Sequence, residues 1–360
     1  NMIDLGIFTA LRQGFAAAGE TAAATDGVLV WRRDTEHLVK EMINNWRSSG
    51  AISDANATDP KFIETIANAY DELALSVMAA IAHGRKLQQP ELHIYELGEL
   101  NRQAKRMADK MAAGSPYLTI SLDMLIRGNS ELAISRICTL DGTSRLRYVE
   151  RPGASHMHEQ LETLGRDIEL LRAYQPDPDA KIKLILLEDN VRGITADMID
   201  LPRQLMASRN LLGNAEISGI VSSFVMADPA HAGQALHAVI SYPAGVKYDI
   251  ITPRDCTLLD GYGVLLPSGR IGRLPGFYPY ACPAARMGIA PELADDFSAA
   301  IIAANKKFFA TIQAALGHEF TVRDVHPLMA RAMAELHHVT PDQKLSDLFT
   351  HWQDPASNQQ

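Results

Sequence analysis

Two adjacent carboxylates, Glu188 and Asp189, are the strongest candidates for chemistry in this sequence. They follow the apolar run 181–187, and Gly193-Ile194-Thr195 comes shortly after them. Ligands of open α/β sheets bind outside the carboxyl ends of the strands, where free N–H groups at a helix start favour phosphate. We therefore expect Glu188 and Asp189 to bind ribose hydroxyls or Mg²⁺, with Asp189 as the metal ligand, and Gly193 and Thr195 to bind phosphate. The alternative is that the two acids only end a strand and begin a turn.

A second candidate is the long segment 266–283, which is rich in glycine, proline and aromatic residues. A loop of this length inside a compact domain is typical of a functional element. Its Arg270 and Arg273 offer forked donors, which would stabilise a pyrophosphate or a substrate carboxylate. We expect the segment to pack over the carboxyl edge of strand 182–187, with one arginine near an anion held at Thr195. The alternative is a surface hairpin.

Histidines and nearby acids suggest an alternative site for iron or zinc. His156 and His158 are two residues apart, so they cannot face one metal from a regular helix, although they could from a strand or loop. His326, beside Asp324, could complete such a site. The simpler interpretation is structural. It places His156 at a helix start and Asp324 as the N-cap of a helix, and His337-His338 would stabilise a helix C-terminus.

These candidates lie among alternating strands and helices. The expected order is strand 181–187, a turn at 188–193, helix 195–209, strand 217–226, helix 229–238 and strand 246–251. Such a β-α-β-α-β order predicts adjacent strands of one mostly parallel sheet.

The segment 182–251 resembles the diphosphoribosyl-binding part of type I phosphoribosyltransferases. In that family an apolar strand leads into two acidic residues and a small loop of threonine and glycine. The segments 214–221 and 245–251 of this chain are similar to the elements that follow there. The resemblance implies a Mg²⁺-assisted transferase acting on a phosphorylated sugar or nucleotide.

The rest of the chain favours helices and a small antiparallel sheet. Residues 2–111 have the apolar spacing of bundle helices, with Asp59-Pro60 before one helix and a basic face in another at 95–111. Alternating residues and an Asp141-Gly142 turn predict an antiparallel sheet across 117–149, and helices are expected at 156–174, 291–316 and 325–338. We therefore expect an α+β protein with segments 1–115, 116–175, 176–290 and 291–360.

Composition limits the function classes. The 360 residues include 43 acidic and 34 basic side chains, for a net charge of −9, which argues against general nucleic-acid binding but leaves room for a local basic site. No signal peptide or membrane-spanning run is visible, and the three cysteines form no CxxC pair. We expect a cytoplasmic small-molecule transferase. The sequence is also compatible with a homo-oligomer. The alternatives are a metal-dependent enzyme and a non-enzymatic binding or dimerisation protein.

Overall fold

The protein forms two compact units, each assembled from segments that are distant in the sequence. The structure, a computed structural model, describes residues 28–33, 35–87, 91–122, 127–138, 144–150, 154–191, 202–225, 237–239, 248–251, 262–274 and 287–350. Unit 1 comprises Asn1–Ile94, Arg136–Arg147 and Asp249–Gln360, and unit 2 comprises Tyr95–Ser135 and Tyr148–Tyr248. Each unit takes residues from more than one of the four expected segments. The fold class is α+β, as the sequence predicts.

Unit 1 is mainly helical. Its helices are α2 (Thr35–Ser49), α3 (Asp54–Thr58), α4 (Pro60–Gly84), α9 (Ala294–Leu316), α10 (Pro327–His337) and α11 (Leu345–Thr350), with 3-10 turns at Pro291–Leu293 and Val322–Asp324. Helix α4 begins where expected, because the Asp59 carboxylate accepts a hydrogen bond from the Lys61 N–H (3.0 Å) and Pro60 occupies the first turn. In the described part of the chain, no helix is long and apolar enough to cross a membrane.

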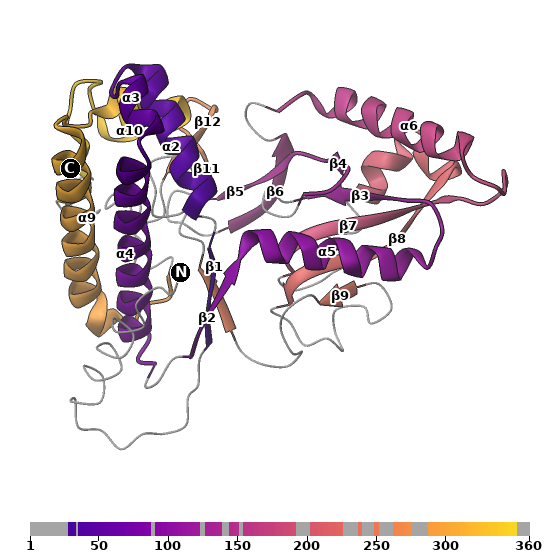
Figure 1. Ribbon diagram of the computed structural model, residues 1–360, viewed down its shortest axis with the longest axis horizontal. Helices are drawn as coiled ribbons and strands as arrows, with labels where there is room; N and C mark the ends of the chain where they lie inside the picture. Colours follow the sequence, from indigo (N-terminus) through magenta and orange to yellow (C-terminus); the bar gives the residue numbers. More distant parts are fainter. Residues whose placement is uncertain are drawn as a thin grey trace. The chain divides into compact units, whose positions relative to one another are not determined.

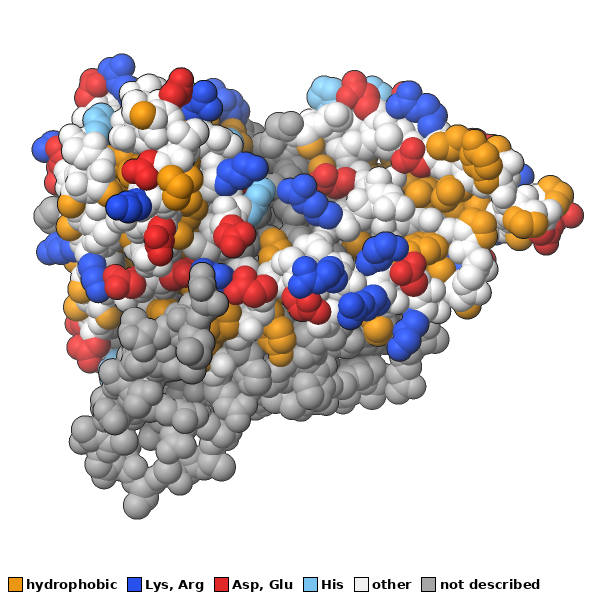
Figure 2. All heavy atoms as spheres, viewed as in Figure 1, with side chains coloured by type: hydrophobic (Ala, Val, Ile, Leu, Met, Phe, Trp, Pro, Cys, Tyr) orange, Lys and Arg blue, Asp and Glu red, His pale blue; other side chains and the backbone are white. Residues whose placement is uncertain are grey.

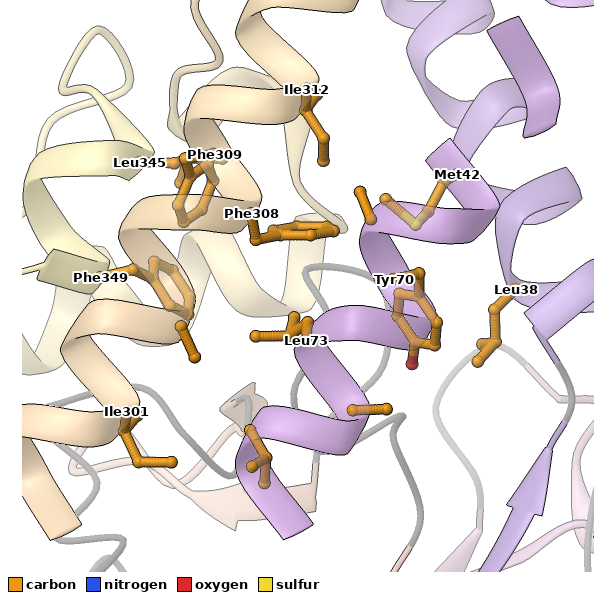
Figure 3. Packing of buried hydrophobic residues seen from close by; sticks show 14 of the residues in the cluster. Leu38, Met42, Tyr70, Leu73, Ile301, Phe308, Phe309, Ile312, Leu345 and Phe349 are labelled. Atoms are coloured by element: carbon orange, nitrogen blue, oxygen red, sulfur yellow. The ribbon is translucent and has the colours of Figure 1, made fainter. Parts of the chain in front are cut away.

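The core of unit 1 lies between α4 and its helical neighbours (Figure 3). Tyr70 of α4 meets Phe308 of α9 edge to face, with ring centroids 6.5 Å apart. Phe309 of α9 packs on Phe349 of α11, with centroids 5.7 Å apart. Met42 of α2 belongs to the same buried cluster. Because α4 has partners on two sides, it buries residues around most of its circumference.

Two strands interrupt the first 110 residues, so the prediction of an almost wholly helical region is wrong. Strands β1 (Val28–Arg33) and β2 (Glu91–Glu96) form a three-stranded sheet with β10 (Tyr248–Ile251), in the order β10-β1-β2. Leu29 and Trp31 of β1 are both buried, which is the two-residue period of a strand. Each of these two strands has only six residues, which is too few to reveal a two-residue period next to long helical patterns. The helix expected around Leu5–Phe15 lies outside the described residues.

A second sheet has the order β12-β11-β5-β6. Its strands are β5 (Ile134–Cys138), β6 (Ser144–Glu150), β11 (Tyr262–Leu265) and β12 (Ile271–Leu274). Strands β11 and β12 are antiparallel neighbours, so the first part of segment 266–283 belongs to a hairpin, the alternative offered for it above. Strands β5 and β6 are also neighbours, as the hairpin signal predicts, although Asp141-Gly142 lies outside the described residues.

Unit 2 is built around a five-stranded parallel sheet of order β4-β3-β7-β8-β9 (Figure 1). Its strands are β3 (Tyr117–Ser121), β4 (Ser130–Glu131), β7 (Ile182–Val191), β8 (Ala215–Val225) and β9 (His237–Val239). Every neighbouring pair is parallel. The runs expected at 181–187 and 217–226 are therefore adjacent strands of one sheet, as predicted.

Three other expectations about these strands are wrong. Strand β3 pairs with β7 rather than joining an antiparallel sheet, and β10 pairs with β1 instead of continuing the parallel sheet. Residues 237–239, expected to end a helix, form β9. Alternation identifies a strand but not its partner, and β3 is buried on both faces, as a central parallel strand should be.

Helices cover both faces of the parallel sheet. Helix α6 (Met157–Ala173) packs through Leu164 and Ile168 on the face that carries Leu184 and Leu186 of β7. Helix α5 (Leu97–Ala112) packs on the opposite face through alanines spaced by four residues, and this face carries Ile185. The result is a three-layer α/β/α arrangement, in which small side chains let α5 lie close to the sheet.

Candidate functional site at the carboxyl edge of the parallel sheet

The strand order of unit 2 contains a topological switch point beside β3. From β3 the chain passes to β4 on one side, and after α6 it returns to the sheet as β7 on the other side. The connection after β3 leads to β4 and the connection after β7 leads to β8, so the two run in opposite directions. Ligands of open α/β sheets bind at such a point, outside the carboxyl ends of the two strands. The ends of β3 and β7 therefore define the candidate site.

Glu188 lies at this edge, but within a strand. The ladder between β7 and β8 continues past it, with Glu188 opposite Ser222 and Asn190 opposite Phe224, so the expected turn at 188–190 is wrong. Strand β3 ends at this level, where the Leu122 N–H donates to the Leu187 carbonyl (3.0 Å).

Glu188 is half-buried as a residue, in contrast to the fully buried Ser222 beside it. By strand alternation Glu188 lies on the α6 face of the sheet. The side chain of Asp189 and all of Gly193 and Thr195 are outside the described residues, so their roles stay predictions.

The loop between β3 and β4 supplies a residue that the sequence analysis missed, Arg127. The Arg127 N–H donates to Asn101 Oδ1 of α5 (2.8 Å), and the Asn129 N–H donates to Thr119 Oγ1 of β3 (2.9 Å). Between them Gly128 lies against β3, where an added Cβ would be 2.5 Å from the Thr119 carbonyl oxygen. Residues 127–129 are thus held by two hydrogen bonds and by the close approach of Gly128 to β3, while Arg127 is exposed.

The structure assigns no hydrogen bond or ion pair to the Arg127 guanidinium among the described residues. Gly128 and Asn129 lie beside Thr119 of β3, and an exposed arginine next to them can hold two oxygens of a phosphate or carboxylate at once. The sequence signal for Arg127 is the Arg127-Gly128 pair, which comes soon after the alternating run 117–122.

Arg270 belongs to unit 1 and strand 182–187 to unit 2, so the expected packing of segment 266–283 over that strand stays a prediction. Glu335 of α10 accepts hydrogen bonds from the Ser268 N–H (2.6 Å) and hydroxyl (2.8 Å), and Arg270 forms an ion pair with it (3.5 Å). These interactions, those of Ser268 first, hold the pKa of Glu335 below its usual value. Arg270 therefore helps to fix the hairpin turn on α10. Arg273 lies on β12 of the same hairpin, and an anion-binding role for either arginine stays a prediction.

The histidines have structural positions. His156 is the N-cap residue of α6, and its ring stacks on that of His158, with centroids 5.8 Å apart. His326, not Asp324, is the N-cap of α10, because its Nδ1 accepts the Leu328 N–H (3.2 Å). Asp324 instead accepts the Thr321 N–H (2.9 Å) in a capping box. Within the described ranges, no three His, Cys, Asp or Glu residues are grouped to hold a metal ion.

The sequence predicts that a charged His337 stabilises the end of α10, and this prediction is wrong. Burial, with a contribution from His338, lowers the pKa of His337 to about 4, so its imidazole is neutral at neutral pH. His338 ends the helix as its C-cap, in a left-handed conformation with φ of 54°.

Comparisons of the chain with family models, curated proteins and solved structures found no match.

Proposed function

We propose that the protein is a small-molecule transferase that binds a phosphorylated sugar or nucleotide at the carboxyl edge of the parallel sheet in unit 2. The observation that carries this proposal is the switch point, where Arg127 follows β3 and Glu188 extends β7 beyond the end of β3. At this edge Arg127, held by Asn101 of α5, offers a cation for phosphate on the α5 side, and Glu188 offers a carboxylate for hydroxyl groups on the α6 side. The resemblance of segment 182–251 to type I phosphoribosyltransferases supports the same substrate class.

Each group has a defined role in this proposal. The Arg127 fork binds phosphate oxygens, and Glu188 accepts hydrogen bonds from ribose hydroxyls. Gly193 and Thr195 would add phosphate contacts, and Asp189 would hold a Mg²⁺ that arrives with the phosphorylated ligand. Transfer chemistry of this kind depends on positioning and on stabilising the charge of the leaving group, so it needs no strong general base.

Isothermal titration calorimetry with ribose 5-phosphate and AMP, each with and without Mg²⁺, tests the proposal. Arg127→Gln should weaken binding of both ligands about tenfold or more, because it removes a charge-assisted contact to phosphate. Glu188→Gln should weaken binding of both ligands but leave the affinity for inorganic phosphate unchanged. The matched control is Arg166→Gln, which changes an exposed arginine of α6 that bonds only to Thr163 among the described residues.

The proposal fails if neither ligand binds to the wild-type protein. It also fails if Arg127→Gln and Glu188→Gln bind both ligands as the control does while their circular dichroism spectra match that of the wild type.

A further inference from the structure

One face of α5 carries a row of basic side chains on an otherwise acidic protein. Its four members are exposed, and we call them the α5 stripe: Arg102, Lys105, Arg106 and Lys110. Figure 2 shows Lys and Arg side chains gathered where α5 runs in Figure 1. The chain as a whole has a net charge of −9, so this face has the opposite sign to the average surface.

The α5 stripe is only partly neutralised. Arg102 forms an ion pair with Glu99, and Lys105 forms one with Asp109 (3.4 Å). Of the described residues, none forms a hydrogen bond or ion pair with the side chain of Arg106 or Lys110. Arg106 acts on Glu99 only through a weaker electrostatic attraction that helps to lower its pKa, after the hydrogen bonds from Gln103 and Arg102. As far as the described residues are concerned, these two cations are therefore available to an external anion.

Two contacts fix the direction of α5 on the sheet. Lys183, near the start of β7, donates to the carbonyl of Ala112 at the end of α5 (3.0 Å). Asn101, near the start of α5, accepts the Arg127 N–H in the loop after β3 (2.8 Å). The helix therefore begins at the carboxyl edge and runs back along the sheet for about 24 Å. From Arg102, next to the Asn101 that holds the Arg127 N–H, to Lys110, the α5 stripe covers about 12 Å of this length.

We propose that the α5 stripe binds the phosphate backbone of a single-stranded nucleic acid whose terminal nucleotide reaches the site at Arg127. The proposal rests on the proposed function, because it extends that site from one phosphate to several. Arg106 and Lys110 are one helical turn apart, about 6 Å along the axis, so they face a linear polyanion in series. Such a local contact is compatible with a composition that argues against general nucleic-acid binding.

A lipid surface fits this face less well. The apolar side of α5, with Leu100, Ala104, Ala108 and Ala112, is buried. None of the exposed large hydrophobic residues of the described chain lies on α5. A helix that binds a bilayer surface inserts apolar side chains as well as presenting basic ones, and α5 has none to insert.

Fluorescence anisotropy with a labelled twelve-nucleotide single-stranded RNA, and the matching DNA, tests the proposal over a series of salt concentrations. The variant R106E/K110E reverses the two charges that have no partner among the described residues. The control K40E/K306E makes the same change in net charge at exposed lysines of α2 and α9 in unit 1. At low salt R106E/K110E should bind at least tenfold more weakly than the control. Its log–log salt slope should be smaller by about 1.4, or about 0.7 for each lost phosphate contact.

The proposal is overturned if the oligonucleotides do not bind at low salt or if R106E/K110E behaves as the control does. Equal binding of polyglutamate or of phosphatidylserine vesicles would also overturn it, since the stripe would then recognise any anion. AMP binding by R106E/K110E separates the two proposals. The affinity of R106E/K110E for AMP should equal that of the wild type, because AMP reaches only the edge site. If the wild-type protein binds the oligonucleotides but not AMP, the proposed function alone is contradicted.

Discussion

Replacing Asp71 by alanine should destabilise unit 1 far more than replacing the next residue, Glu72. Both lie on α4 and both form ion pairs of similar length. Asp71 pairs with Arg33 of β1 at 2.7 Å, and Glu72 pairs with Lys307 of α9 at 2.9 Å. The side chains of the first pair are 18% and 12% exposed, whereas those of the second are 66% and 43% exposed. The two pairs therefore differ in burial and in the number of hydrogen bonds that the carboxylate accepts.

The expected cost follows from the contacts that each substitution removes. Asp71 also accepts the Thr35 hydroxyl hydrogen bond (2.6 Å), so Asp71→Ala leaves a hydroxyl and a guanidinium without their shared acceptor in a mostly dry site. A charge-assisted bond contributes about 1.5–3 kcal/mol and a neutral one about 1 kcal/mol, so we expect a loss of about 2–4 kcal/mol. Glu72→Ala removes an exposed ion pair, which is worth about 0.2–1 kcal/mol.

Tryptophan fluorescence during urea unfolding measures both losses in the correct unit, because all three tryptophans of the chain belong to unit 1. The midpoint should fall clearly for Asp71→Ala and change little for Glu72→Ala, with an unchanged slope for both. Equal shifts for the two variants would refute the reasoning that burial of the Asp71 pair, rather than its charge, sets its contribution.

Three further predictions concern other parts of the fold. Because the pKa of His337 is lowered from 6.5 to about 4, the unfolded state binds a proton in that window and the folded state does not, so stability should fall as pH drops from 6.5 to 4. His337→Leu should flatten this pH dependence of the unfolding free energy. Gly128→Ala should cost about 1–3 kcal/mol and weaken AMP binding, since its Cβ would meet the backbone of β3, while Gly213→Ala, with no atom within 4 Å, should do neither. Ala108→Leu should cost about 1–3 kcal/mol by overpacking the α5–sheet contact, whereas Lys105→Leu on the exposed face should change the urea midpoint followed by circular dichroism very little.

Local signals in the sequence were enough to predict several elements. The Asp59-Pro60 start of α4 is confirmed, because a cap and a first-turn proline act through groups within three residues. The apolar runs of β7 and β8 are confirmed as neighbouring parallel strands, because strands separated by a helical crossover pair in parallel. The hairpin of β11 and β12, the alternative offered for segment 266–283, is observed because its two strands are joined by only the short turn 266–270 and pair locally.

Only the tertiary structure decided which strands pair and which side chains meet. Strand β3 pairs with β7, and β10 with β1, because a strand's partner depends on contacts between segments distant in the sequence, which alternation within the strand does not indicate. Glu188 belongs to a strand because a longer β8 continues the ladder beside it. Arg127 and Asn101 are 26 residues apart, and nothing in either local sequence indicates their contact. The candidate site arises from that contact, since the packing of α5 on the sheet fixes the loop after β3.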